Sequence, residues 1–218
     1  MLEEGLPSYN SIAEEERGAA ERVLRGGSLS GFYGSAGKNF YGGPEVRRLE
    51  AAWCERFQVK HAIAMNSATS GLMAAAAACN LGPGDEMIVP PFTMIASATA
   101  AKLWGACAVF ADVREDTFTL DPECVAQCIT SRTKAIMAVN LFGQAADFDA
   151  LLALARSHGL MVIEDNAQAP GAHYRGRPVG TLGDIGVFSL NCHKTIQCGE
   201  GGVVCTNDDK LAEKLQLI

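Results

Sequence analysis

The alternation of strand and helix is clearest in the stretch TKAIMAVNLFGQAADFDALLALARSHGLMVIEDNA, residues 133–167. Two short runs of apolar and β-branched residues, 133–140 and 161–167, flank a segment of helical character at 147–158 that stops before Gly159. A strand, a helix and a second strand in this order are typical of a parallel sheet, whose neighbouring strands need a long crossover. The stretch therefore predicts an α/β domain.

The same alternation continues on both sides of this stretch. We predict seven strands, near residues 61–66, 86–91, 107–113, 133–140, 161–167, 184–190 and 201–207. Helices are expected between the earlier strands, at 69–79, 94–104, 121–130 and 147–158. Only about ten residues, without a helical pattern, separate the last two strands, so the seventh strand is expected to be antiparallel. The predicted fold is a three-layer α/β/α arrangement with a mostly parallel seven-stranded sheet.

The chain before this pattern is predicted to form a helix and a glycine-rich loop. Residues 10–25 are rich in charge and indicate an exposed helix, whereas residues 26–43 contain seven glycines in eighteen positions. The loop is interpreted either as a segment that orders on contact with a ligand or partner chain, or as a plain flexible connector. We therefore divide the chain into residues 1–45 and a large domain at 46–218, which we expect to end inside a helix.

The composition is that of an acidic globular protein. Among 218 residues, 18 are basic and 25 acidic, which gives a formal net charge of −7, and no Lys/Arg run supplies a surface for nucleic acid or anionic membrane. Residues 87–110 match a membrane span in length and carry only the charge of Lys102, but Pro90 and Pro91 divide them into shorter elements. The N-terminus lacks the pattern of a signal peptide. These features predict a cytoplasmic protein that binds neither nucleic acid nor membrane.

The cysteines do not indicate a disulfide framework or a metal site. A chain of this size does not need disulfides to fold, and no Cys-x-x-Cys pair occurs. The nearest pair, Cys124 and Cys128, has no histidine pair at zinc spacing. We therefore interpret the cysteines as reduced, buried thiols. The eight are Cys54, Cys79, Cys107, Cys124, Cys128, Cys192, Cys198 and Cys205.

The residues that follow each strand are candidates for a site, because ligands of open α/β sheets bind beyond the carboxyl ends of the strands. Ser67, Ala68 and Thr69 follow the first predicted strand and open a helix, where free backbone N–H groups can bind a phosphate. An ordinary helix N-cap is the alternative interpretation of these small residues. The fifth strand ends at Asp165, and the sixth at Ser189.

Asp165 and Lys194 are the candidates for chemistry. The carboxylate of Asp165 follows a buried strand and needs a partner, which is a protonated ring nitrogen, an ordinary salt bridge or a metal. Of seven lysines, only Lys194 follows the carboxyl end of a strand, and Lys38 in the glycine-rich loop is its one competitor. A lysine in such a pocket can form a Schiff base with a carbonyl compound. Phosphate cradle, carboxylate and lysine together are the set that a pyridoxal phosphate (PLP) enzyme requires.

Six motifs occur in a fixed order along the chain. They are NSATSGL (66–72), IVPPFTMIASA (88–98), FADVREDTFTLDPE (110–123), VNLFGQAADFDAL (139–151), VIEDNAQAPGAHYRG (162–176) and GDIGVFSLNCHKTIQCGEGGVVCTND (183–208). With these motifs the chain resembles the fold-type I, PLP-dependent sugar aminotransferases of the DegT/DnrJ/StrS type. The resemblance implies transfer of an amino group from a donor, such as glutamate, to a keto sugar carried on a nucleotide, as in polysaccharide biosynthesis. It also implies a homodimer.

The resemblance implies roles for three residues around the PLP ring. Lys194 would hold the cofactor as a Schiff base and later move a proton between cofactor carbon atoms. Asp165 would pair with the pyridinium nitrogen, and Gln168 would bond the phenolic oxygen. A dehydratase branch of the family has His in place of the lysine. Lys194 keeps the family's five-residue interval from Ser189, and the adjacent His193 is out of register.

Other residues are implied as contacts of the cofactor phosphate and ring. Ala68 and Thr69 would bind the phosphate through their backbone amides and Ser189 through its hydroxyl. Ser67 is a weaker candidate for the same phosphate. Phe92 would stack on the ring, as an aromatic side chain in such a pocket can.

The sequence also departs from the family pattern, and alternatives stay open. Leu190 stands where Phe is usual, Asn140 stands where His is common, and the family's smaller C-terminal domain is expected to be absent. A PLP-dependent sugar dehydratase and a PLP-binding fragment without turnover are therefore alternatives to the aminotransferase. An NAD-dependent oxidoreductase is not favoured, because no G-x-G-x-x-G motif follows any strand.

Overall fold

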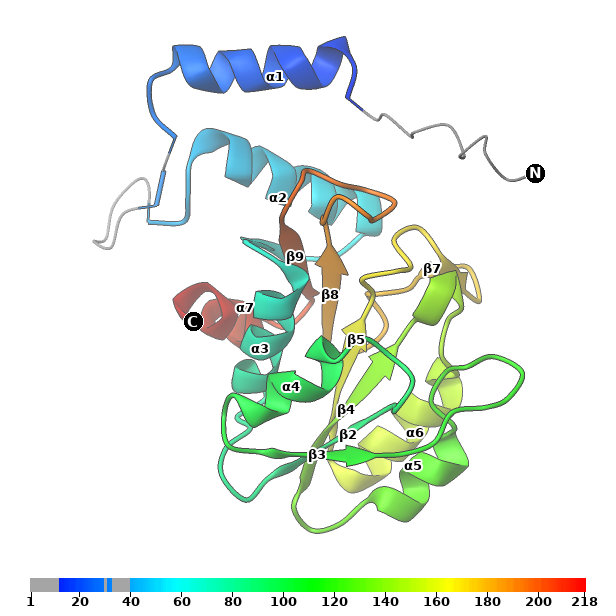
Figure 1. Cartoon of the computed structure of the whole chain (residues 1–218). Coiled ribbons are helices and arrows are strands. Elements are labelled where there is room, and N and C mark those ends of the chain that lie inside the picture. The colour runs from blue at the N-terminus through cyan, green and yellow to red at the C-terminus, as the bar shows by residue number, and fades with distance from the viewer. Residues whose placement is uncertain (1–11, 30, 33–39) are drawn as a thin grey trace, which may run out of the picture. The chain divides into compact units, whose positions relative to one another are not determined.

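The computed structural model describes residues 12–29, 31–32 and 40–218. The chain forms two compact units, residues 1–47 and 48–218. Figure 1 shows the sheet and its helices in the second unit, where the predicted alternation of strand and helix is found.

Helix α1 (Glu14–Arg25) is the main described element of the first unit, and it buries none of its residues. Three glutamates occupy its first turn, and Arg22 and Arg25 occupy its last. Charges of these signs at these ends interact favourably with the helix dipole. The predicted exposed, charged helix is confirmed, whereas the interpretation of the glycine-rich loop falls largely on residues 30 and 33–39, which lie outside the described residues.

The second unit is built on a seven-stranded sheet, and all seven predicted strands are confirmed. They are β1 (His61–Met65), β2 (Glu86–Val89), β3 (Cys107–Phe110), β4 (Thr133–Val139), β5 (Met161–Asp165), β8 (Ile185–Ser189) and β9 (Gly202–Thr206). Their order across the sheet is β1-β9-β8-β5-β4-β2-β3. Strand β9 runs antiparallel to both of its neighbours, and the other pairs are parallel. The short connection from β8 to β9 therefore gives the antiparallel strand that was expected.

Helices cover both faces of the sheet, which makes the predicted three-layer α/β/α fold (Figure 1). One face packs against α3 (Ala68–Ala78), α4 (Ala96–Lys102) and α7 (Asp209–Leu217). The other packs against α2 (Pro44–Phe57), α5 (Pro122–Cys128) and α6 (Phe148–His158). Since both faces are buried, the strands are apolar along nearly their whole length rather than alternating with polar residues.

Helix α3 lies unusually close to the sheet because its inner face carries alanines and one glycine. A Cβ atom at Gly71 would lie 2.9 Å from the side chains of both Val187 on β8 and Val204 on β9. Only glycine fits at this distance. The close packing fixes the start of α3 beside the carboxyl end of β8.

Four elements were not predicted from the sequence. They are helix α2, the hairpin of β6 (His173–Tyr174) and β7 (Arg177–Pro178), and the 3-10 turn η1 (Leu141–Gly143). Helix α2 buries only Trp53 and Phe57, and its other positions are mostly exposed or half-buried, so its apolar stripe is narrow. The hairpin strands have two residues each, too short to give a periodic pattern.

All eight cysteines are free, but the interpretation of them as buried thiols is wrong in part. Only Cys79 and Cys205 are buried, whereas Cys107, Cys192 and Cys198 are exposed. The exposed three lie on an edge strand and in the β8–β9 loop, where little packs above them. Within the described ranges, no helix combines the length and the apolar character that a membrane span needs.

Candidate functional site

A pocket of about 350 Å³ lies beyond the carboxyl ends of β1, β5 and β8. Seven of the eight predicted site residues line it, although they are spread over more than a hundred positions of the sequence. The lining residues are Ser67, Ala68, Thr69, Leu72, Thr93, Met94, Ala96, Val139, Asp165, Ala167, Gln168, Ser189, Asn191, His193, Lys194 and Glu200. The eighth predicted residue, Phe92, is not among them.

The start of α3 forms one wall of the pocket. Ser67 is the N-cap of this helix, and its Oγ accepts a hydrogen bond of 3.1 Å from the amide of Ser70. The N-cap interpretation of this serine is therefore confirmed. The next two amides, of Ala68 and Thr69, belong to the first turn of a helix, where N–H groups have no acceptor within the helix. This wall offers backbone donors and the positive end of a helix dipole to an anion.

Asp165 is buried at the end of β5, on the face of the sheet that α3 and α4 cover. The hydroxyl of Ser97 donates to its Oδ2 at 2.7 Å, and the amide of Ala167 donates to its Oδ1 at 3.2 Å. Burial raises the pKa of this carboxyl above its usual value, while the two hydrogen bonds and the charge of Lys194 act in the opposite direction.

No cation of the described chain lies within ion-pair distance of Asp165. None of the ion pairs within 4 Å includes it, so the ordinary salt bridge considered from the sequence is wrong for the part of the chain that the structure describes. Nor do the described residues contain a group of three or more His, Cys, Asp or Glu that could hold a metal. A buried carboxylate of this kind fits a ligand that brings its own positive charge.

Lys194 lies in the loop between β8 and β9 and is half-buried. Its amide donates to the carbonyl of Asn191 at 2.9 Å, and no ion pair between described residues involves its ammonium group. Two other lysines have partners far from the pocket, since Lys60 pairs with Asp209 at 2.6 Å and Lys214 donates to Asn80 at 2.8 Å.

The remaining lysines do not compete for the site. None of Lys102, Lys134 and Lys210 lines the pocket, and all three are exposed. Lys38, the competitor named from the sequence, lies outside the described residues. Of the lysines that the structure describes, Lys194 alone lines the pocket with Asp165.

Gln168 and Ser189 reach the pocket with hydrogen-bonding groups to spare. Oε1 of Gln168 accepts from the amide of Phe142 at 3.0 Å, which fixes the side-chain amide and leaves its N–H groups as donors. The hydroxyl of Ser189 accepts from the amide of Asn191 at 3.3 Å and keeps its own proton for another acceptor. Both side chains can therefore donate to an oxygen of a ligand.

Phe92 lies with other aromatic residues at the protein surface. Its ring centroid is 5.7 Å from that of Phe118 and 6.5 Å from that of Phe142, and half of the residue is exposed. The next residue along the chain, Thr93, does line the pocket. The expected stacking of Phe92 on a cofactor ring stays a prediction.

Sequence reasoning missed several residues of the pocket and of its support. Thr93, Asn191 and Glu200 line the pocket, as does His193, which had no expected role. Asn191 donates to Glu200 at 2.7 Å across the β8–β9 loop. Ser97 contacts Asp165 although the two are 68 positions apart in the sequence, and no local sequence pattern predicts such a contact.

Asn140, by contrast, does not line the pocket. It is buried and donates to Glu164 at 3.3 Å and to Asn166 at 3.0 Å, and its Oδ1 accepts from the amide of Ala146 at 3.1 Å. These contacts tie together the loops behind β4 and β5. The residue that replaces a common His of the family pattern therefore serves the fold.

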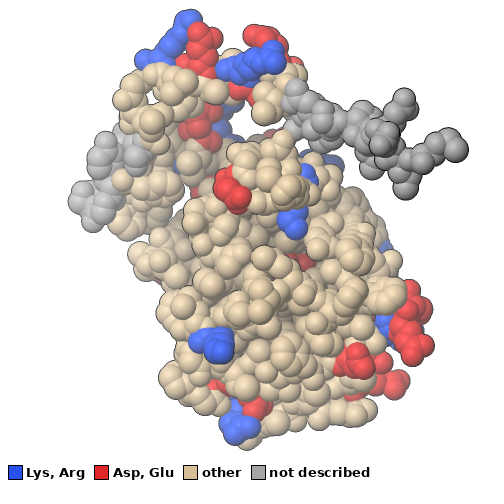
Figure 2. All heavy atoms as spheres, viewed as in Figure 1, with Lys and Arg blue, Asp and Glu red and all other residues tan. Residues whose placement is uncertain are grey.

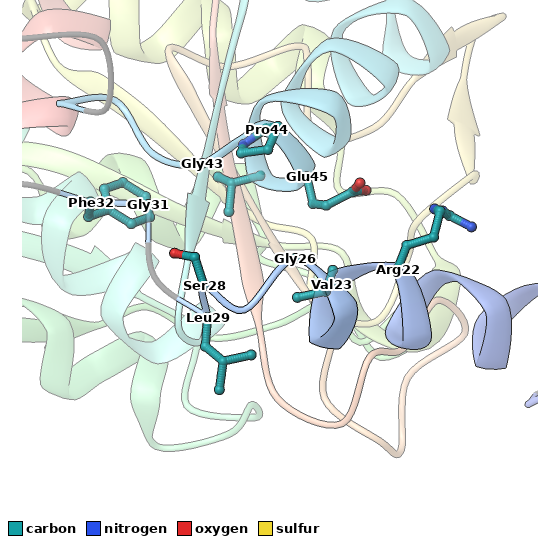
Figure 3. Close-up of a pocket in the computed structure, with 11 residues that line it drawn as sticks. Arg22, Val23, Gly26, Ser28, Leu29, Gly31, Phe32, Gly43, Pro44 and Glu45 are labelled. Carbon is teal, nitrogen blue, oxygen red and sulfur yellow. The ribbon is translucent and has the colours of Figure 1, made fainter.

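A second pocket, of about 470 Å³, lies in the first unit and contains none of the predicted site residues. Figure 3 shows its lining, which comes from the end of α1, the segment after it and the start of α2. Arg22 and Glu45 are the ionisable residues among its described lining. This described lining offers no lysine, so the pocket with Lys194 is the candidate active site.

The chain has clear relatives among known proteins. The chain matches the model of the DegT/DnrJ/EryC1/StrS aminotransferase family over residues 13–218. It is 49% identical over 173 residues to a GDP-perosamine synthase of Caulobacter vibrioides, covering 79% of this chain and 47% of the relative. It is 40% identical over 212 residues to a dTDP-3-amino-3,4,6-trideoxy-alpha-D-glucose transaminase of Streptomyces venezuelae, covering 97% of this chain and 53% of the relative. The chain therefore spans about half the length of these curated relatives.

The fold leads to the same family. The crystal structure of DesV from Streptomyces venezuelae, in complex with a ketimine intermediate, matches with a TM-score of 0.85 and 41% sequence identity. The match covers 93% of this chain and 52% of that one. Since the family model extends over nearly the whole chain and the fold agrees, the resemblance expected from the six motifs is confirmed. The chain belongs to the DegT/DnrJ/EryC1/StrS aminotransferase family.

Proposed function

We propose that this chain provides the cofactor pocket of a PLP-dependent aminotransferase that moves an amino group from a donor, such as glutamate, to a nucleotide-linked keto sugar. The observation that carries the proposal is the shared pocket of Asp165 and Lys194, in which the carboxylate is buried and no described cation lies within ion-pair distance of it. The named relatives, a GDP-sugar synthase and a dTDP-sugar transaminase, support a sugar nucleotide as the substrate class.

The residues of the pocket fit PLP by their chemistry. Bound PLP supplies an aldehyde that forms Schiff bases with amines and a ring that accepts electrons. We assign the cofactor phosphate to the amides of Ala68 and Thr69 and the hydroxyl of Ser189, with Ser67 as a weaker contact. These groups bind an anion without adding a positive charge, which agrees with the acidic composition of the chain.

Asp165 and Gln168 are assigned to the ring, together with Phe92 as a stacking residue. Asp165 holds a proton at the ring nitrogen, because a buried carboxylate gains most from a positive partner. Gln168 donates from its side-chain amide to the phenolic oxygen. The hydrogen bond from Phe142 to the Gln168 oxygen presents the amide in that orientation.

Lys194 is assigned as the catalytic residue. Its amine would hold the cofactor through the cofactor aldehyde, and the same amine would move a proton between cofactor carbon atoms. The loop from Asn191 to Glu200 positions it, with the hydrogen bond between those two residues across the loop.

We also propose that the protein acts as a homodimer. Large apolar residues are exposed on the second unit, and they include Met94, which lines the pocket, as well as Ile95, Leu103, Phe118 and Phe142. Figure 2 shows few charged side chains over the face that α3 and α4 cover. An exposed apolar surface of this kind is typical of a contact with another protein.

The proposed reaction is tested by product analysis. Purified protein is incubated with PLP, L-glutamate and GDP- or dTDP-linked keto sugars, and the sugar products and 2-oxoglutarate are measured. We expect an aminated sugar and an equal amount of 2-oxoglutarate. Loss of water from the sugar without consumption of glutamate would show the dehydratase instead, and bound PLP without either product would show a binding protein without turnover.

A further inference from the structure

We infer that Ser97 is a positioning residue for Asp165, and that Thr93 supports Ser97 through a hydrogen bond to its hydroxyl. Ser97 holds one carboxylate oxygen so that the carboxylate stays ionised and correctly turned toward the ring nitrogen of the cofactor. The inference rests on the proposed function. Ser97 does not line the pocket, so it acts through Asp165 rather than on the ligand.

The contact between Ser97 and Asp165 is short and buried. Ser97 is fully buried in α4, and its Oγ donates to Oδ2 of Asp165 at 2.7 Å. This length is typical of a hydroxyl that bonds a charged oxygen. In a buried setting such a bond is stronger than in water, and its loss leaves an oxygen without a donor.

The order of donors follows from counting protons. A serine hydroxyl has one proton, and that of Ser97 goes to Asp165. Thr93 Oγ1 lies 3.0 Å from Ser97 Oγ, so Thr93 must be the donor in that pair. The two hydroxyls thus point in series at the carboxylate. This direction suits an ionised Asp165, because a protonated carboxyl would itself need an acceptor.

The two oxygens of Asp165 are held from different elements. Oδ1 accepts from the amide of Ala167, which follows in the same chain segment, at 3.2 Å. Oδ2 is held only by Ser97 from α4 among the described residues. Loss of the serine hydroxyl therefore removes the contact that fixes the carboxylate relative to the helix layer.

Thr99, in the same helix as Ser97, shows how a hydroxyl side chain ordinarily bonds within a helix. Thr99 Oγ1 lies 3.1 Å from the carbonyl of Ile95 and 3.4 Å from that of Ala96, which is the ordinary bonding of Ser and Thr within a helix. Ser97 instead donates its proton to the carboxylate of Asp165, which is 68 positions away in the sequence. Thr99 therefore offers a matched control with a hydroxyl in the same helix.

The test compares Ser97→Ala with Thr99→Val in protein loaded with PLP. We measure the dissociation constant of PLP and the pH midpoint at which the visible band of the bound cofactor changes. For Ser97→Ala we expect PLP to bind about tenfold more weakly. We also expect the midpoint to move to higher pH, because a ring nitrogen that is less firmly protonated withdraws fewer electrons from the Schiff base. Thr99→Val should change neither quantity.

The other ionisable residues of the pocket are the same in all variants. His193, Lys194 and Glu200 line it beside Asp165, and none is altered. A shift of the midpoint that Ser97→Ala shows and Thr99→Val does not therefore reports on Asp165. Thr93→Val, which leaves Ser97 in place, should move both quantities in the same direction by less.

The outcomes separate this inference from the proposed function. Wild-type protein that fails to bind PLP would overturn both. Wild-type protein that binds PLP at Lys194, with Ser97→Ala unchanged in affinity and midpoint, would overturn the positioning role alone. If Ser97→Ala does not fold, Thr93→Val decides, and unchanged values in that variant count against the inference.

Discussion

Two consecutive carboxyl groups at the end of β5 face opposite sides of the sheet and have different surroundings. Glu164 accepts from the amides of Gly180 and Gly183, each at 2.6 Å, and also from Leu182 and Asn140. Asp165 has two donors and faces the pocket. Glu164 thus has protein donors for both of its oxygens, whereas each oxygen of Asp165 has one donor and the carboxylate faces the pocket. We therefore expect Glu164 to serve stability and Asp165 to serve the proposed cofactor.

Asp165→Asn is expected to stabilise the PLP-free protein at neutral pH while weakening PLP binding. The folded-state pKa of Asp165 is raised, so its contribution to stability is complete below the ordinary pKa of Asp and is lost as pH rises through the raised value. Asn stays neutral throughout. Urea unfolding between pH 5 and pH 8 should show the variant's advantage growing with pH, and an advantage that is absent or reversed at pH 8 would contradict the assignment.

Glu164→Gln is the matched substitution on the other face of the sheet. It should destabilise the folded protein and leave PLP binding unchanged. Its amide nitrogen cannot accept from the backbone amides that the carboxylate now serves, which leaves buried donors unpaired. We expect a loss of about 1–3 kcal/mol in the free energy of unfolding. PLP affinity of the folded variant should be unchanged. A stable variant that no longer binds PLP would show that Glu164, too, serves the cofactor.

At the scale of elements, the pocket depends on how closely α3 approaches the sheet. The helix start must reach the carboxyl end of β8, and two glycines permit it. Besides Gly71 in the helix, Gly202 on β9 passes so near that a Cβ would lie 2.7 Å from the amide nitrogen of Ala68. The wall of the pocket that the start of α3 forms therefore results from the packing of the helix against the sheet rather than from the loop before the helix.

Gly71→Ala is expected to destabilise the protein by about 1–3 kcal/mol, because the added methyl overpacks two valines of the sheet. The same substitution at Gly18 should stabilise by about 0.5–1 kcal/mol, since that glycine lies in exposed α1 with no atom within 4 Å of the new Cβ. Urea unfolding of the two variants makes the comparison. Equal effects at both positions would show that α3 does not press on the sheet.

The elements that could be predicted from the sequence are those whose cause is local. The apolar runs of the seven strands and the missing helix between β8 and β9 gave both the sheet and its antiparallel strand. Helix α2 was not predicted, because only Trp53 and Phe57 of its fourteen residues are buried. A narrow stripe of this kind gives little periodicity.

The residues of the candidate site likewise fall into those that a local sequence signal predicts and those that it does not. Asp165 and Lys194 could be predicted, because each follows the carboxyl end of a strand and such ends share one edge of the sheet. Ser97 could not, since its contact with Asp165 depends on how α4 packs across the sheet. Phe92 was placed from family resemblance, and the structure locates it with Phe118 and Phe142 at the surface.

At the scale of the whole molecule, the apolar residues around the pocket leave a surface that a second copy can cover. Ile95 is 72% exposed and follows Met94, which lines the pocket. A protein contact at this position would also shield the pocket from water. The proposed dimer and the proposed site are thus neighbours on the surface.

Ile95→Glu is expected to weaken self-association without unfolding the protein, because it places a charge on this apolar surface while burying nothing new. Sedimentation velocity over a range of protein concentrations measures the change. Gln127→Glu, which adds the same charge at an exposed position of α5, is the control. A dimer that resists Ile95→Glu, or a wild-type protein that is monomeric at all concentrations, would refute the proposed contact.

The proposal that Lys194 holds PLP can be tested directly by reduction and peptide mapping. Protein incubated with PLP is treated with borohydride, which makes the Schiff base permanent, and the digest is analysed by mass spectrometry, with Lys194→Ala as the control. The expected result is a single pyridoxyl label on Lys194 that the control lacks. A label on Lys38 or another lysine, or no label at all, would contradict the assignment.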